Sequence, residues 1–159
     1  MYRHLALLVT VLSLSVVSLA HAGLDEGRAA YYRGDYAKAY EEFKRLAEQG
    51  DAQAQYHLGL MYANGHGVTA DNSEAAKWFR KAAEQGNADA QSGLGSMYAF
   101  GQGVAQDVVL GYMWLDLAAA QGNSEAENLR DEFAESMTRS QVAEAQRLAR
   151  EWKPKCNDE

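Results

Sequence analysis

The sequence has almost no cysteine, since Cys156 is the only one in 159 residues. No internal disulfide can form, and the fold therefore has to be held together by packing. Cys156 stands in the polar tail "KPKCNDE", where no histidine or acid pattern marks it as a nucleophile. It is interpreted either as an incidental thiol or as one half of an intermolecular disulfide, and both alternatives stay open.

Basic residues are scarce as well. The chain has 15 Lys and Arg against 22 Asp and Glu. Without Arg3, which lies at the extreme N-terminus, the balance is 14 against 22, a net charge of −8. Nucleic-acid phosphates bind clustered Lys and Arg side chains, and anionic membrane surfaces attract the same positive charge. The composition therefore argues against nucleic acid and against an anionic membrane as partners.

Long hydrophobic runs are absent beyond the N-terminus. The run from Leu5 to Val17 follows a short basic start and is shorter than the about 20 residues of a membrane-spanning helix. It leads into Ala-His-Ala at 20–22, a small-x-small cleavage pattern without a lipid-accepting cysteine. We expect residues 1–22 to be a cleaved signal peptide, the mature protein to be periplasmic or secreted, and no stable membrane anchor to remain.

Patterns of catalysis and metal binding are also missing. The sequence contains no G-x-S-x-G elbow and no Ser-His-Asp order. His57 and His66 lie nine residues apart with no cysteine nearby, which is not a metal-ligand spacing. Nothing picks out a catalytic pair among the many carboxylates. We therefore expect no catalytic residues, no metal and no cofactor, and we predict that the protein is not an enzyme.

The glycine-rich stretch "MYANGHGVTAD" at 61–71 resembles a phosphate-binding loop at first sight. Such a loop needs a preceding strand and a Lys-Ser or Lys-Thr at its end, and this stretch has neither. A second copy, "MYAFGQGVAQD" at 97–107, keeps both glycines and replaces His66 with Gln102. The stretch is therefore predicted to be a hinge between two helices.

A repeat of 36 residues organises the rest of the chain. Residues 51–86 align without gaps on 87–122, and a period of this length with helical patterning is typical of a solenoid of helical hairpins. Weaker matches continue on both sides. The unit before residue 51 is shorter, with its helices joined at "RGDYAKA", as expected of an end unit that shows one face to water.

Each full repeat is predicted to hold two helices. Ala54, Leu58 and Tyr62 form one apolar stripe at helical spacing, and alanines dominate the stripe of the second helix. Gly59 and its copy Gly95 each cost about 1 kcal/mol inside a helix. Their recurrence indicates that a crossing helix leaves no room for a Cβ atom.

The junctions between repeats read Gly-Asp or Gly-Asn, at 50–51, 86–87 and 122–123. Glycine suits the left-handed residue that ends a helix, and Asp or Asn caps the next one. Beyond residue 123, Ser124-x-x-Glu127 and Thr138-x-x-Gln141 match the capping-box pattern of two more helices. The second of them has an apolar face that ends at Trp152 and is expected to cover the last repeat.

The predicted fold class is all-α, an α-solenoid of stacked antiparallel helix hairpins with about eight helices. Its predicted parts are a signal peptide (1–22), an N-terminal partial repeat (23–50), two full repeats (51–86 and 87–122), two C-terminal capping helices (123–153) and a polar tail (154–159).

The repeat resembles the Sel-1-like repeat family, which is related to the tetratricopeptide repeat. The likeness rests on A-x-A-x-x-x-LG-x-x-Y-x-x-G-x-GV-x-x-D, followed at fixed distances by A, W, KAA and QG. Gly111 and Leu117 depart from it, where Ala and Lys would be usual. The resemblance implies a right-handed superhelix of helix pairs that binds other proteins, and exported members often act as adaptors of the cell envelope.

The resemblance also implies a binding face, because the first helix of each pair lines the concave side of such stacks. The residues predicted to face this side and to contact a partner are Tyr31, Tyr32, Gln53, Tyr56, His57, Leu60, Asn64, Asp89, Ser96 and Phe100. Their aromatic members would anchor a partner. The alternative that several of them only pack between repeats stays open.

The function expected from these features is a non-enzymatic protein-interaction module or adaptor of the cell envelope, with a protein or peptide on the concave face. The alternative is an enzyme or binder acting on cell-wall glycan, which would show converging carboxylates beside His57. A structural unit that stacks on its own copies is a third interpretation. The partner and the oligomeric state are not fixed by the sequence.

Overall fold

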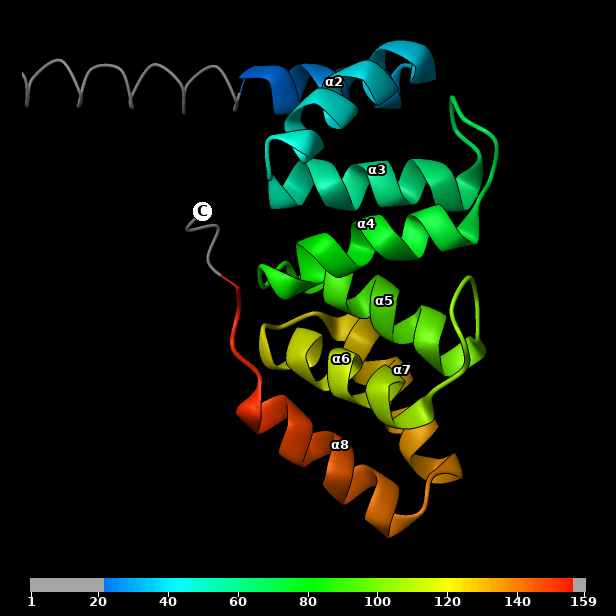
Figure 1. Ribbon diagram of the computed structural model, residues 1–159, viewed down its shortest axis with the longest axis vertical. Helices are drawn as coiled ribbons and strands as arrows, with labels where there is room; N and C mark the ends of the chain where they lie inside the picture. The colour runs from blue at the N-terminus through cyan, green and yellow to red at the C-terminus, as the bar shows by residue number, and fades with distance from the viewer. Residues whose placement is uncertain (1–21, 156–159) are drawn as a thin grey trace, which may run out of the picture.

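The computed structural model describes residues 22–155, and every regular element in that range is an α-helix. A helical segment over 22–32 is followed by seven helices of 13 residues each (Figure 1). They are α2 (Tyr36–Glu48), α3 (Ala52–Asn64), α4 (Asn72–Glu84), α5 (Ala88–Phe100), α6 (Val108–Ala120), α7 (Ser124–Ser136) and α8 (Arg139–Glu151). Successive helices from α2 to α7 pack on one another in a stack, and α8 packs on α6. This arrangement confirms the predicted all-α solenoid.

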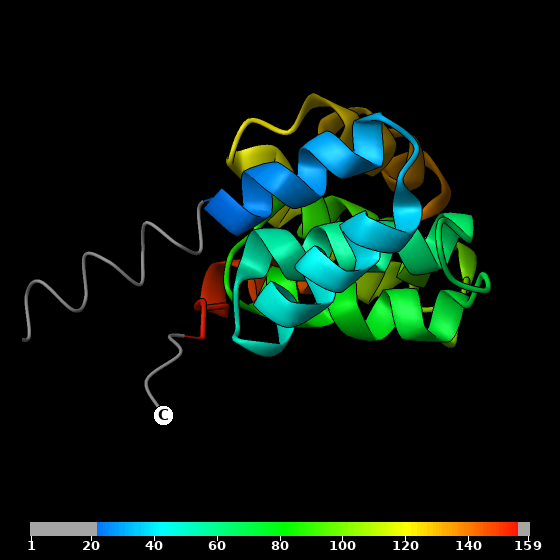
Figure 2. The same ribbon diagram turned by 90° about the horizontal axis from the view of Figure 1, so that it is seen from above.

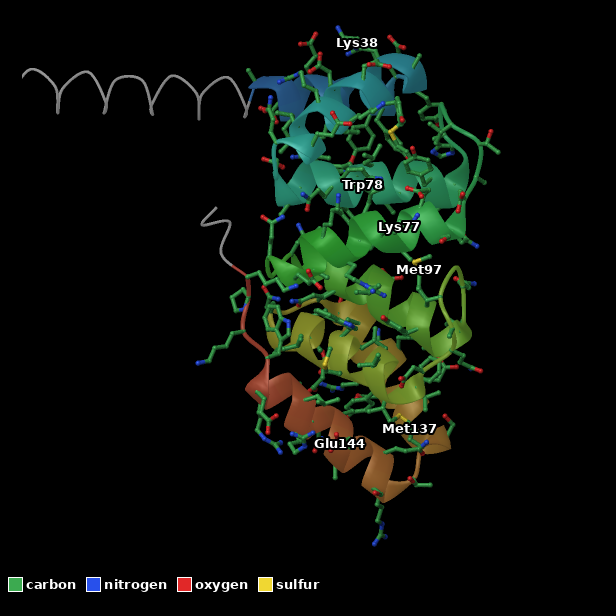
Figure 3. All side chains as sticks on the ribbon, viewed as in Figure 1. Lys38, Lys77, Trp78, Met97, Met137 and Glu144 are labelled. Atoms are coloured by element: carbon green, nitrogen blue, oxygen red, sulfur yellow. The ribbon has the colours of Figure 1, made fainter. Side chains whose placement is uncertain are left out.

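Alanine makes the close packing of this stack possible. Among residues 22–155, more than half of the buried apolar residues are alanines, such as Ala39, Ala75 and Ala83. Larger side chains fill the remaining space, led by Phe43, Leu58 and others that are almost completely buried. Side chains fill the layers between helices along the stack, with Lys38 and Glu144 near its two ends (Figure 3).

Gly59 and Gly95 lie where the sequence predicted a lack of room. A Cβ atom on Gly59 would lie 2.7 Å from the Phe79 ring of α4. On Gly95 it would lie 2.8 Å from Leu115 and 3.0 Å from the carbonyl oxygen of Gly111, both on α6. In each repeat, a glycine of the first helix thus lets the second helix pass close by.

The junctions between repeats behave as predicted. Asp51, Asn87 and Asn123 cap α3, α5 and α7 through their side-chain oxygens, and the preceding glycines have φ between 89° and 95°. The prediction of a capping box at Ser124 is wrong, because Asn123 takes the cap position and Ser124 is the first helical residue. The Thr138–Gln141 capping box is confirmed.

Two buried glutamines connect successive repeats, which the sequence interpretation overlooked. Gln55 donates to the Ala47 carbonyl oxygen at 3.1 Å and accepts from Gln85 at 2.8 Å. The same pair of bonds recurs 36 residues later, from Gln91 to Ala83 and from Gln121 to Gln91. In the repeat alignment Gln55 matches Gln91, and Gln85 matches Gln121. This recurrence could have identified the bonded pairs from the sequence.

Candidate binding groove

The first helix of each pair faces one side of the stack. Seen from above, the helical segment 22–32 and α7 lie on the same side of the molecule (Figure 2). Two hollows open there, lined mainly by the helical segment 22–32, α3, α5 and α7. They share Tyr56, Leu60 and Asp89, and we refer to the two together as the concave groove.

The N-terminal hollow has a volume of about 430 Å³. It lies between the helical segment 22–32 and α3, and most of its wall is aromatic. Its lining residues are Arg28, Tyr31, Tyr32, Phe43, Gln53, Tyr56, His57, Leu60 and Asp89.

The C-terminal hollow is smaller, at about 280 Å³. Its apolar floor comes chiefly from α3, α4 and α5, and α7 closes the far side. Its lining residues are Tyr56, Leu60, Ala63, Asn64, Asn72, Phe79, Asp89, Ser92, Gly93, Ser96, Met97, Gln102, Asn123, Glu125 and Leu129.

The structure brings together nine of the ten residues predicted to contact a partner. Only Phe100 lines neither hollow; its side chain is 55% exposed, and its ring lies edge-on to Phe133 of α7 with 5.2 Å between the ring centroids. The other nine are Tyr31, Tyr32, Gln53, Tyr56, His57, Leu60, Asn64, Asp89 and Ser96.

The three tyrosines of the groove differ in how firmly the protein holds them. Tyr31 is half-buried and its hydroxyl lies 2.7 Å from Nδ1 of His66, whose ring stacks on Tyr36. Tyr56 is half-buried against Phe79. Tyr32 is 81% exposed. Packing between units therefore buries part of the Tyr31 and Tyr56 side chains, whereas most of the Tyr32 side chain is open to solvent.

His66 holds the glycine-rich loop against the first unit. The loop turns the chain between α3 and α4, and Gly67 at its tip approaches the backbone of Tyr36 so closely that a Cβ atom would lie 2.7 Å from its carbonyl oxygen. Gly67 also has a φ of 74°, which few other residues adopt. The recurrence of these glycines thus follows from backbone geometry.

His57 is held as a neutral ring within the groove. It stacks on Phe43 with a centroid separation of 4.7 Å and an interplanar angle of 15°. Burial lowers the pKa of His57 to about 4, and the positive charge of Arg28 acts in the same direction. Near neutral pH, His57 therefore contributes an uncharged aromatic surface.

Tyr56 lies within the field of two carboxylates. Burial raises its pKa, and the negative charges of Asp89 and Glu125 raise it further. Sequence interpretation missed Glu125 because the repeat pattern fades in α7. The 36-residue period could have found it, since Gln53, Asp89 and Glu125 occupy the same position in three successive units.

Other groove residues had no signal in the sequence. Asn123 and Leu129 reach the groove only because α7 packs beside α5, and Phe43 comes from the second helix of the first unit. Among residues 22–155, no group of three or more His, Cys, Asp or Glu side chains is placed to hold a metal ion. The same residues include no helix long and apolar enough to cross a membrane.

Comparison with known proteins identifies the repeat. The model of the Sel1 repeat matches three times, at residues 19–51, 52–87 and 88–123. No curated protein matches the chain. Among solved structures, a protective antigen present in uropathogenic Escherichia coli strains and displaying an SLR fold is 34% identical, with a TM-score of 0.80 over 84% of this chain.

A Sel1 repeat protein from Oxalobacter formigenes is 44% identical over 60% of this chain, with a TM-score of 0.59. The chain spans less than a third of either protein, at 29% and 28% of their lengths. Sel1 repeats typically mediate protein–protein interactions. With three repeat matches that cover more than half of its length, the chain belongs to the Sel1 repeat family.

Proposed function

We propose that the protein is a non-enzymatic interaction module of the bacterial cell envelope that holds a segment of another protein in its concave groove. The observation that carries this proposal is the groove itself, a continuous surface in which aromatic side chains from successive units face solvent together. Tyrosine anchors of this kind supply much of the binding energy at protein interfaces.

The shape of the groove supports an elongated occupant. Its two hollows follow one another along the stack and meet at Tyr56, Leu60 and Asp89. A ligand that spans both therefore crosses several successive helices. An extended peptide segment or the edge of a folded partner satisfies this geometry.

Location in the envelope is part of the same proposal and is supported by the N-terminal sequence. The basic start, the apolar run and the Ala-His-Ala site lie at residues 1–22, almost entirely outside the described residues. Fractionation of cells that express the full chain tests it. A processed protein in the periplasm or the medium is expected, and an unprocessed cytoplasmic protein would contradict export.

Tyr32 offers the cleanest test of the groove because its exposed side chain contributes little to the core. The Tyr32→Ala variant is expected to keep its circular dichroism spectrum and melting temperature but to lose at least about tenfold in affinity, as truncated aromatic anchors do. The measurement is capture of envelope proteins by the purified variants, followed by titration of the captured partner.

Phe100→Ala provides the matched control, since it removes an exposed ring that lies outside both hollows. It is expected to bind as the wild type does. Unchanged binding by Tyr32→Ala would overturn the groove assignment. Competition by purified peptidoglycan fragments in the same titration would instead favour the glycan alternative.

A further inference from the structure

The C-terminal hollow carries negative charge that the chain itself leaves unbalanced. Asp89 of α5 and Glu125 of α7 both line it. Asp89 accepts a hydrogen bond from the Asn123 side chain at 3.0 Å. Within residues 22–155, neither carboxylate takes part in an ion pair.

The surface beside these carboxylates is apolar. Tyr56, Leu60 and Leu129 line the same hollow and are each partly buried. Lysine and arginine lay their methylene stems along apolar surface while their charged ends reach polar groups. A tyrosine ring also attracts a cation placed over its face. Aromatic and aliphatic walls next to two carboxylates therefore fit a long basic side chain.

Ser92 adds a hydroxyl group without a protein partner to the wall of the hollow. Its side chain lines the hollow and the residue is only 8% exposed. Within the described part of the chain its hydroxyl makes no hydrogen bond. Since no fully enclosed side-chain polar atom of residues 22–155 lacks a partner, the Ser92 hydroxyl oxygen is open to the hollow. A hydrogen-bond donor that enters the hollow would satisfy the Ser92 oxygen.

We propose that the C-terminal hollow binds a basic side chain, arginine or lysine, of the partner segment. The stem of this side chain lies against Leu60 and Leu129, and its cation lies near Asp89 and Glu125 with a hydrogen bond to Ser92. Arginine fits best, because its planar fork of five N–H donors can serve several acceptors at once. This inference rests on the proposed peptide-binding function.

The test uses an immobilised array of acetylated decapeptides. Their sequences are random except for one central position, which is fixed as Arg, Lys, Gln or Glu. The purified mature protein is expected to bind the Arg and Lys sets about tenfold more strongly than the Gln set, and the Glu set least. The preference is expected to weaken as salt rises.

Two variants with the same change in net charge separate the hollow from the rest of the surface. Asp89→Asn with Glu125→Gln removes the two groove carboxylates and is expected to abolish the preference for basic peptides. Glu41→Gln with Glu135→Gln removes two exposed carboxylates outside both hollows and is expected to preserve it. Loss of the preference in both variants would overturn the inference.

The remaining outcomes separate this inference from the proposed function. Peptides bound without regard to charge, but released by Tyr32→Ala, would overturn the basic-residue inference and leave the groove assignment standing. An array on which no peptide is retained would overturn the basic-residue inference, and the capture experiment with Tyr32→Ala would then decide the groove assignment by itself.

Discussion

At the scale of single residues, Gly59 and Gly95 control how closely the helices of each repeat approach. A methyl group on Gly59 would meet the buried Phe79 ring, and one on Gly95 would meet both the side chain and the backbone of α6. Overpacking of a well-filled core costs typically 1–3 kcal/mol. At either position, the steric cost of an added methyl group therefore offsets or exceeds the gain in helix propensity that alanine offers, which is about 1 kcal/mol.

The first prediction follows from this comparison. Gly59→Ala and Gly95→Ala should each lower the free energy of urea unfolding by up to about 2 kcal/mol, with the larger loss at Gly95 because backbone cannot move aside. Gly93→Ala is the matched control on α5, since its added Cβ would have 3.4 Å to the nearest atom, the Phe79 ring. Gly93→Ala should be neutral or stabilising, and a loss comparable to that of Gly95→Ala would contradict the packing argument.

A second prediction concerns His57, whose pKa is about 4 in the folded chain and near 6.5 in an unfolded chain. Between these values the unfolded chain binds the proton more tightly, so the contribution of neutral His57 to stability is lost as pH falls from 6.5 to 4. His57→Phe keeps the stacking on Phe43 and removes the titration. Between pH 7 and pH 4 the wild type should lose up to about 3 kcal/mol more than this variant.

Arg28→Gln supplies a further check on the same residue. It removes a positive charge that lowers the pKa of His57, so the titration of the ring should move toward 6.5. Nuclear magnetic resonance of the His57 ring protons measures this directly. An ordinary pKa in the wild type would refute the description of His57 as a buried neutral ring.

At the scale of elements, two stretches match the capping-box pattern, but only one of them forms the box. Thr138 and Gln141 form a reciprocal capping box, whereas Ser124 lies inside α7 and Asn123 caps that helix. The third prediction is that Thr138→Ala lowers unfolding free energy by about 1 kcal/mol, and that Ser124→Ala changes it by only a few tenths. Equal losses in denaturant titrations would show that the caps are assigned wrongly.

The elements that the sequence predicted well are those fixed by local chemistry or by repetition. Helix ends followed from Gly-Asp and Gly-Asn junctions, and close helix crossings followed from Gly59 and Gly95. Nine of the ten residues predicted to face the groove line it, because the first helices of successive repeats place equivalent positions on the same side of the stack. Phe100 differs because its ring packs edge-on against Phe133 of α7. Nothing in the sequence indicated this contact, since α7 has no clear repeat signature.

At the scale of the whole molecule, the groove exists only because several units stack in one curve. The helices from α2 to α7 pack mainly on their neighbours in the chain, as in other repeat proteins, whereas α8 packs on α6. The wall of the groove is nevertheless assembled from residues as distant in sequence as Arg28 and Leu129. Neither the length of the groove nor the approach of α7 to α5 can be read from one repeat, because both depend on the stack.

Site-specific photo-crosslinking in living cells tests the central claim most directly. A photoreactive amino acid is placed at Asn64 or Ser96 within the groove, and at the exposed Lys77 and Glu144, which lie outside it. The groove positions should give one discrete crosslinked protein that disappears with Tyr32→Ala, and the outside positions should give none. Crosslinks to the same protein from Lys77 or Glu144 but not from the groove would contradict the account.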